Sequence, residues 1–232
     1  MELVELTSPV LGARSTLVAQ GRDAVVVDAG AGVAGDARAA ADARGLVVHA
    51  VLLTHGHADH AWDAAALGVP VHVHRADAYR LADPFGTLGP LGHAPGGEGA
   101  LAQVLRQAGI DPASYRAPEQ VVPFGGPAGP EGRSPDEVLT FGALTLVARH
   151  APGHSEGSTI YLVGDAALTG DVLFFGTIGR TDLRGGDDLV MAQTLRDVVV
   201  RLPAATRVLP GHGRATTMAV ELHHNPFLNL TA

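Results

Sequence analysis

One short run of the sequence restricts the fold more than any other feature, because four potential metal ligands fall within six residues. These are His55, His57, Asp59 and His60, and they directly follow an apolar segment, 47–54, that is predicted to be a buried strand. Chance placement of three His and one Asp at these offsets is expected only about 0.002 times in such a chain. His55 and His57 can converge on one ion from an extended segment, whereas Asp59 and His60 begin a predicted helix and point elsewhere. One strand-to-helix turn could therefore supply ligands to two neighbouring ions.

Three further residues of ligand type each follow another predicted strand. They are His154 after 144–149, Asp171 after 167–169 and His212 after 206–209. Each lies beside a glycine, which allows the tight backbone needed where the chain crowds a metal ion. Any one of them alone would be interpreted as a turn residue. Together with the six-residue run, they predict one metal centre with seven ligands.

The composition narrows the chemistry of such a site. The 232 residues include 12 His and no Cys, so a metal would be held by imidazole and carboxylate groups, and a cysteine nucleophile is excluded. The formal net charge is −8, which argues against a non-specific nucleic-acid binder. The first residues lack the pattern of a signal peptide, and no apolar run approaches the roughly 18 residues of a membrane span. We therefore expect a cytoplasmic protein with neither nucleic acid nor membrane as partner.

The pattern of apolar residues predicts an α/β fold in a single domain, 1–232. Further strands are expected at 17–19, 24–28, 69–74 and 159–163, and helices at 35–44, 58–67 and 188–202. The stretch 83–136 holds 11 of the 30 Gly and 9 of the 15 Pro, so it is predicted to be an insertion that is mainly loop, with one short helix at 99–109. Two roles stay open for this insertion, a mobile surface loop or a lid over the site.

The motifs, taken in chain order, resemble those of the metallo-β-lactamase-fold hydrolases. They are H-x-H-x-D-H at 55–60, G-H-S at 153–155, G-D at 170–171 and G-H-G at 211–213. The resemblance implies the family's α/β fold, an αβ/βα four-layer sandwich of two mixed β-sheets flanked by helices. It also implies two divalent metal ions, with Zn expected and Fe or Mn as alternatives. The first ion would be held by His55, His57 and His154, the second by Asp59, His60 and His212, and Asp171 would bridge them.

Within the superfamily the chain is most similar to the glyoxalase II-like (hydroxyacylglutathione hydrolase-like) branch. The similarity lies in the segments 175–182, 210–213, 216–217 and 225–226. It implies a binuclear metallohydrolase that cleaves a thioester of a 2-hydroxy acid by a metal-bound hydroxide, with Asp59 and Asp171 as catalytic residues. In that branch a basic residue at the place of Arg180 contacts the thiol carrier, and a guanidinium can hold a carboxylate through two hydrogen bonds. The alternative for Arg180 is a structural ion pair with Asp182.

The sequence also departs from glyoxalase II, which carries a C-terminal helical extension that recognises glutathione. This chain stops at Ala232, soon after its last predicted ligand. We therefore expect a small-molecule substrate, an acylated low-molecular-weight thiol, whose carrier need not be glutathione, and the insertion could provide a replacement wall. Three related activities stay open: a mononuclear iron persulfide dioxygenase, a lactonase and, less favoured, a β-lactamase. The oligomeric state is not predicted.

Overall fold

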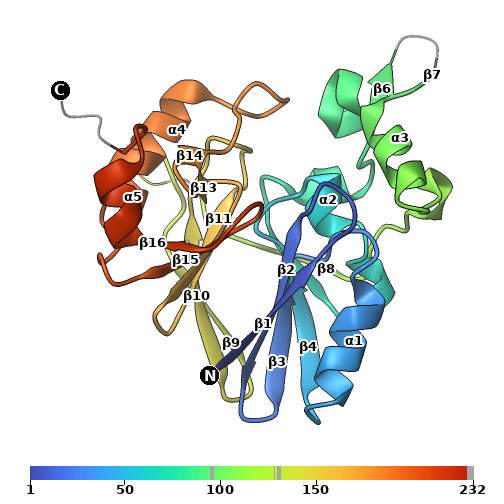
Figure 1. Ribbon diagram of the computed structural model, residues 1–232, viewed down its shortest axis with the longest axis horizontal. Coiled ribbons are helices and arrows are strands. Elements are labelled where there is room, and N and C mark those ends of the chain that lie inside the picture. Colours follow the sequence, from blue (N-terminus) through green and yellow to red (C-terminus); the bar gives the residue numbers. More distant parts are fainter. Residues whose placement is uncertain (95–96, 128, 130–131, 229–232) are drawn as a thin grey trace.

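Two β-sheets form the centre of the structure, a computed structural model that describes residues 1–94, 97–127, 129 and 132–228 (Figure 1). The first sheet has the strand order β1 (Glu2–Thr7), β2 (Arg14–Gln20), β3 (Asp23–Val27), β4 (Val47–Leu52), β5 (Val71–His74) and β8 (Val121–Phe124). Strands β1 to β3 pair antiparallel, since short turns join them. The pairs from β3 through β4 and β5 to β8 are parallel, so the carboxyl ends of these strands meet at one edge.

The second sheet is also mixed. Its strand order is β16 (Thr216–Thr217), β15 (Arg207–Pro210), β12 (Ala166–Gly170), β11 (Thr159–Val163), β10 (Leu144–His150) and β9 (Glu137–Phe141). Both β10 and β12 are antiparallel to β11, and β15 is parallel to β12. Strands β10, β12 and β15 therefore point in the same direction, and their carboxyl ends share one edge of the sheet.

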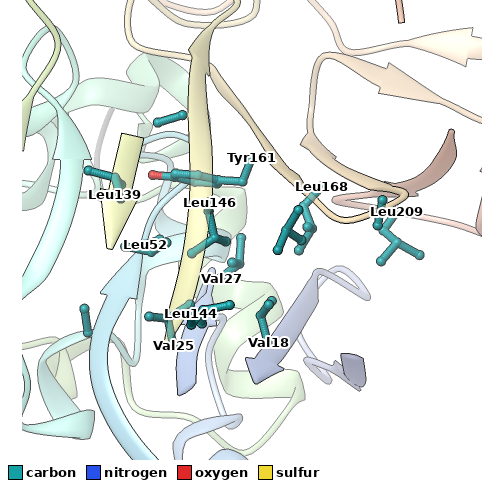
Figure 2. Close-up of a cluster of buried hydrophobic side chains, with 14 of the residues drawn as sticks. Val18, Val25, Val27, Leu52, Leu139, Leu144, Leu146, Tyr161, Leu168 and Leu209 are labelled. Atoms are coloured by element: carbon teal, nitrogen blue, oxygen red, sulfur yellow. The ribbon is translucent and has the colours of Figure 1, made fainter. Parts of the chain in front are cut away.

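Apolar side chains from both sheets fill the layer between them, as Figure 2 shows. Leu52 from the first sheet and Leu146 and Leu168 from the second are at most 3% exposed. Burying one such side chain contributes about 1.5–3 kcal/mol to folding. The phenol of Tyr161 also lies in this layer and donates a hydrogen bond of 2.9 Å to the carbonyl of Leu53, which ties the two sheets together across the core.

Helices cover the outer faces of both sheets and complete the four layers that the resemblance implied. On the first sheet these are α1 (Ala34–Asp42), α2 (Ala58–Ala61) and the 3₁₀ turn η1 (Ala65–Leu67); on the second they are α4 (Asp188–Thr194), the π-helical turn η5 (Leu195–Val199) and α5 (Met218–His224). The helix predicted at 58–67 is thus broken in two. Strands β1 and β9 and helix α5 were not predicted. Within the described residues, no helix is both long and apolar enough to cross a bilayer.

The glycine- and proline-rich stretch 83–136 is more ordered than its composition predicts. It contains η3 (Gly86–Leu91), β6 (His93–Ala94), β7 (Gly97–Glu98), the expected helix α3 (Ala100–Gln107), η4 (Pro112–Ser114) and β8. The prediction of mainly loop was wrong for β8, which completes the first sheet by pairing with β5. Pro123 argues against a strand, but β8 lies at the sheet edge, where proline is tolerated. The part of the stretch that precedes β8, residues 83–120, lies outside the two large sheets and is called the excursion below.

Candidate metal centre

The first predicted ligand group assembles where β4 and β10 end. His57 Nδ1 lies 2.9 Å from His154 Nε2, and His154 Nε2 lies 3.2 Å from His55 Nε2. All three rings are buried. Nitrogen ligands of a tetrahedral zinc ion lie about 2.0–2.1 Å from the metal, which places them about 3.3 Å from one another. The three nitrogens therefore have the spacing of ligands around one ion.

The second group lies beside the first. His60 Nε2 is 3.2 Å from His212 Nε2, and His212 Nε2 is 3.2 Å from Asp59 Oδ2. Asp171 stands between the groups, with Oδ1 3.3 Å from His60 Nε2 and Oδ2 3.6 Å from His154 Nε2 and 3.7 Å from His212 Nε2. The donor atoms form three overlapping sets that could each hold an ion. The structure thus brings all seven predicted side chains together, and they are called the ligand cluster below.

Two details indicate that the cluster is shaped for cations. Asp171 Oδ1 is buried and, in the part of the chain that the structure describes, has only the contact with His60 Nε2, whose geometry is not that of a hydrogen bond. A buried oxygen left in this state is costly unless a further group approaches it. Glycine is also required at position 211, because a Cβ atom there would lie 2.3 Å from Asp171 Oδ1. Gly211 therefore makes room for the side chains of Asp171 and His60.

The protonation states suit metal binding as well. Burial lowers the pKa of His57 to about 3, and it holds the pKa of His55 well below its usual value. Burial also acts against the charged form of His60, but the surrounding carboxylates, led by Asp171, raise its pKa well above the usual value. Although burial raises the pKa of Asp59, the imidazoles, led by His60, lower it overall. His55 and His57 are therefore neutral and the carboxylates are ionised, the forms that bind metal ions, whereas a metal ion binding to His60 would displace a proton.

A buried carboxylate that we did not predict orients the second group. Asp28, directly after β3, lies 2.9 Å from His60 Nδ1 and accepts hydrogen bonds from the Thr54 amide (2.7 Å) and hydroxyl (2.8 Å). A carboxylate on the second ring nitrogen fixes the tautomer, so that Nε2 would be available to a metal ion. Asp28 has φ +57°, a conformation that Asp tolerates better than most residues. A related signal, an ionisable residue at the end of a predicted strand and two residues before a glycine, could have found it.

A second buried carboxylate joins the two ligand-bearing loops. Asp77 accepts hydrogen bonds from the amide of Gly56 (2.8 Å), the amide of Gly157 (2.7 Å) and the hydroxyl of Ser155 (2.7 Å). Its charge is paired with the fully buried Arg80, whose Nε lies 3.3 Å away. One side chain thus fixes the loop of His55 to His60 relative to the loop of His154.

Arg180 contributes to the site in a way that the sequence did not indicate. Its carbonyl lies 2.7 Å from His154 Nδ1, which orients that ring. Its guanidinium makes two hydrogen bonds, of 2.6 and 2.7 Å, with the carboxylate of Asp182. Contact between Arg180 and a substrate stays a prediction, because the side chain lines the cavity beside the cluster but is already paired.

Comparison with known proteins identifies the superfamily of this chain. A family model described as the metallo-beta-lactamase superfamily matches residues 9–212, and the chain belongs to this superfamily. The probable metallo-hydrolase YqgX of Bacillus subtilis is 36% identical over 80% of this chain and 78% of its own length. Hydroxyacylglutathione hydrolase GloC of Haemophilus influenzae is 37% identical over a shorter region, 40% of this chain and 45% of its own length.

Solved structures agree with this assignment. The crystal structure of the BLEG-1 B3 metallo-beta-lactamase has a TM-score of 0.75 at 30% identity and covers 98% of this chain and 100% of its own. The crystal structure of TTHA1623 in a di-iron-bound form has a TM-score of 0.72 at 29% identity, with coverage of 97% and 100%. The fold is therefore that of a metallo-β-lactamase protein, and the superfamily indicates a metal-dependent hydrolase.

Proposed function

We propose that the protein is a binuclear metallohydrolase that cleaves the thioester of an acylated low-molecular-weight thiol. The observation that carries this proposal is the ligand cluster, in which two three-residue groups flank the carboxylate of Asp171. The similarity to a hydroxyacylglutathione hydrolase and to a protein with a di-iron form supports it.

Each residue of the cluster has a defined part in this proposal. His55, His57 and His154 would hold the first ion; Asp59, His60 and His212 would hold the second; and the two oxygens of Asp171 face both groups. Divalent ions bound there would lower the pKa of a water molecule and polarise a carbonyl. Zinc is the expected metal, because a donor set of imidazole and carboxylate suits it, and the same set also accepts iron or manganese.

The protein's own groups would complete the reaction. Asp59 and Asp171 carry negative charge that offsets part of the charge of the cations. Asp28 and the carbonyl of Arg180 keep the rings of His60 and His154 in place. A thiolate is a good enough leaving group to depart without a strong general acid, and a reaction with water needs no cysteine nucleophile, a residue that the sequence lacks.

The test combines metal analysis with turnover. Protein loaded with zinc, iron or manganese is assayed for metal content and for hydrolysis of S-lactoyl thioesters on several carriers. We expect two ions per chain and hydrolysis that is lost on chelation. Asp171→Asn should lower the rate at least about 100-fold, since it removes several kcal/mol of charge stabilisation.

An exposed variant, His223→Ala on α5, is the matched control and should keep full activity. One bound iron with oxygen uptake on a persulfide would overturn the proposal in favour of the dioxygenase. Turnover of lactones but no thioester would overturn it in favour of a lactonase.

A further inference from the structure

The cavity above the ligand cluster has a volume of about 370 Å³ and two unlike sides. The cluster forms one side. The other side is formed by the excursion, through Leu88 and Leu91 of η3 and Leu101 and Val104 of α3. These four residues are called the apolar wall. In Figure 1, α3 stands beside α2 at the end of the molecule where the ligand-bearing loops lie.

The apolar wall is anchored from behind. Leu88 and Leu101 are 7% and 6% exposed and belong to a buried cluster with Trp62, Ala58 and Leu105. Leu91 and Val104 are only partly buried and pack against the same cluster. The wall is therefore a fixed surface that presents methyl groups to the cavity.

Away from the ligand cluster, the cavity offers little to a charged substrate. Among the lining residues that the structure describes, Arg180 is the only Lys or Arg, and its guanidinium is bound through two hydrogen bonds to Asp182. Arg180 holds the pKa of Asp182 down to about 2, so this partner stays ionised and the pair has no net charge. A carrier with free carboxylates would have to open this pair and lose its own hydration in front of a leucine-rich surface.

We propose that the substrate has an apolar, uncharged arm that lies against Leu88, Leu91, Leu101 and Val104 while its reacting group lies at the ligand cluster. The reacting group in this proposal is the thioester of the proposed function. The apolar arm itself is inferred from the wall alone. Each methylene added to the arm should improve binding about fourfold until the wall is covered.

The first experiment does not depend on turnover. Zinc-loaded protein is titrated by calorimetry with S-alkyl thioethers of N-acetylcysteamine, from methyl to octyl, and with the same thioethers of glutathione. We expect affinity to rise about fourfold per methylene over the first few additions, and the uncharged carrier to bind more tightly than glutathione at equal chain length. Flat affinity along both series, or tighter binding of the glutathione series, would overturn the proposal.

The second experiment places a charge in the wall. Val104→Arg should abolish the dependence on chain length and weaken binding of the octyl thioether at least tenfold. Gln103→Arg, the neighbouring residue on the exposed side of α3, is the matched control and should bind like the wild type. If Val104→Arg fails to fold, as judged by circular dichroism and zinc content, Val104→Ser replaces it. Equal effects at positions 103 and 104 would contradict the proposal.

Turnover then separates this proposal from the proposed function. If S-acyl thioesters are hydrolysed but kcat/KM is independent of chain length, the apolar arm is wrong and thioester hydrolysis stands. If no thioester is hydrolysed while the thioethers bind with the expected dependence, hydrolysis of thioesters is wrong and the apolar arm stands.

Discussion

The ligand cluster and the apolar wall face the same cavity, but different interactions hold them. The cluster lies on strand ends of both sheets, and its loops are fixed by buried carboxylates, Asp28 and Asp77, that accept directional hydrogen bonds. The wall belongs to the excursion and is held by packing around Leu105 and Trp62. Hydrogen-bonded networks fix positions closely, whereas apolar packing tolerates exchange of one hydrophobic residue for another of similar volume. The side chains of the ligand cluster are thus held in position by the sheets, whereas the apolar wall should tolerate substitution by other hydrophobic residues.

The largest effect on stability should come from the carboxylate that joins the two ligand loops. Asp77→Ala leaves the fully buried Arg80 without one of its partners and removes three hydrogen bonds. We expect a loss of about 3 kcal/mol in the free energy of unfolding, measured by urea denaturation, together with weaker zinc binding. The exposed variant Asp165→Ala should change stability by less than about 0.5 kcal/mol. A loss that small at Asp77 would show that the loops are held by other contacts.

Truncating a side chain that packs behind the apolar wall should lower the free energy of unfolding nearly as much, but it should leave metal binding unchanged. Leu105→Ala removes a fully buried side chain from α3, for which we expect about 2–4 kcal/mol. Hydrogen exchange should show the loss of protection in α3, with zinc affinity within about twofold of the wild type. Equal losses of protection in β4 and β10 would mean that the apolar wall and the ligand cluster unfold as one cooperative unit. That result would contradict the view that they are held independently.

Removing the carboxylate of Asp28 should weaken metal binding more than it lowers the stability of the fold. Asn has nearly the same shape and tolerates the positive φ at this position, but its amide nitrogen cannot accept a hydrogen bond. Asp28→Asn therefore removes the negative charge beside His60 and one of the two acceptor oxygens. We expect a 10- to 100-fold loss of zinc affinity, measured by competition with a chelator. Asp36→Asn, exposed in the first turn of α1, is the control. Unchanged affinity in Asp28→Asn would limit Asp28 to a role in the fold.

The smallest effect concerns a histidine pair at the same sheet edge as the cluster. The rings of His74 and His150 stack with centroids 3.9 Å apart, and burial, with His150 and Arg75 acting in the same direction, lowers the pKa of His74 to about 3. An unfolded histidine titrates near pH 6.5. Between these values the unfolded chain binds a proton that the folded chain does not, so stability is complete at neutral pH and falls as the pH falls from about 6.5 toward 3.

This dependence can be isolated by substitution. One group changes stability by at most about 1.4 kcal/mol per pH unit. His74→Gln should flatten the curve of unfolding free energy against pH, recorded by urea denaturation in the presence of a chelator. His223→Gln, exposed on α5, should leave the curve unchanged. Parallel curves for wild type and His74→Gln would show that His74 is protonated equally in both states.

Much of the fold could be predicted from local patterns. The runs of β-branched residues predicted β11 to the residue and β4 to within two residues at its end, because β-branched side chains favour strands. The strand β8 could not be found in this way, since Pro123 is acceptable only at an edge and the edge is defined by the whole sheet. The break between α2 and η1, and the change to a π-helical turn at η5, likewise have no signal in the helical spacing of the apolar residues.

By itself, the sequence determined the seven candidate ligands, because His55, His57, Asp59 and His60 are neighbours in the chain and each of the other three follows a predicted strand beside a glycine. Only the tertiary structure decided which buried residues position the ligand cluster and which surface lies across the cavity from it. Asp28 meets Thr54 across 26 residues and Asp77 meets Gly157 across 80, through strand pairing and loop packing that no local pattern encodes. The leucines of the excursion show the same limit. At helical spacing they indicate a buried face, and only the folded chain places that face beside the ligand cluster.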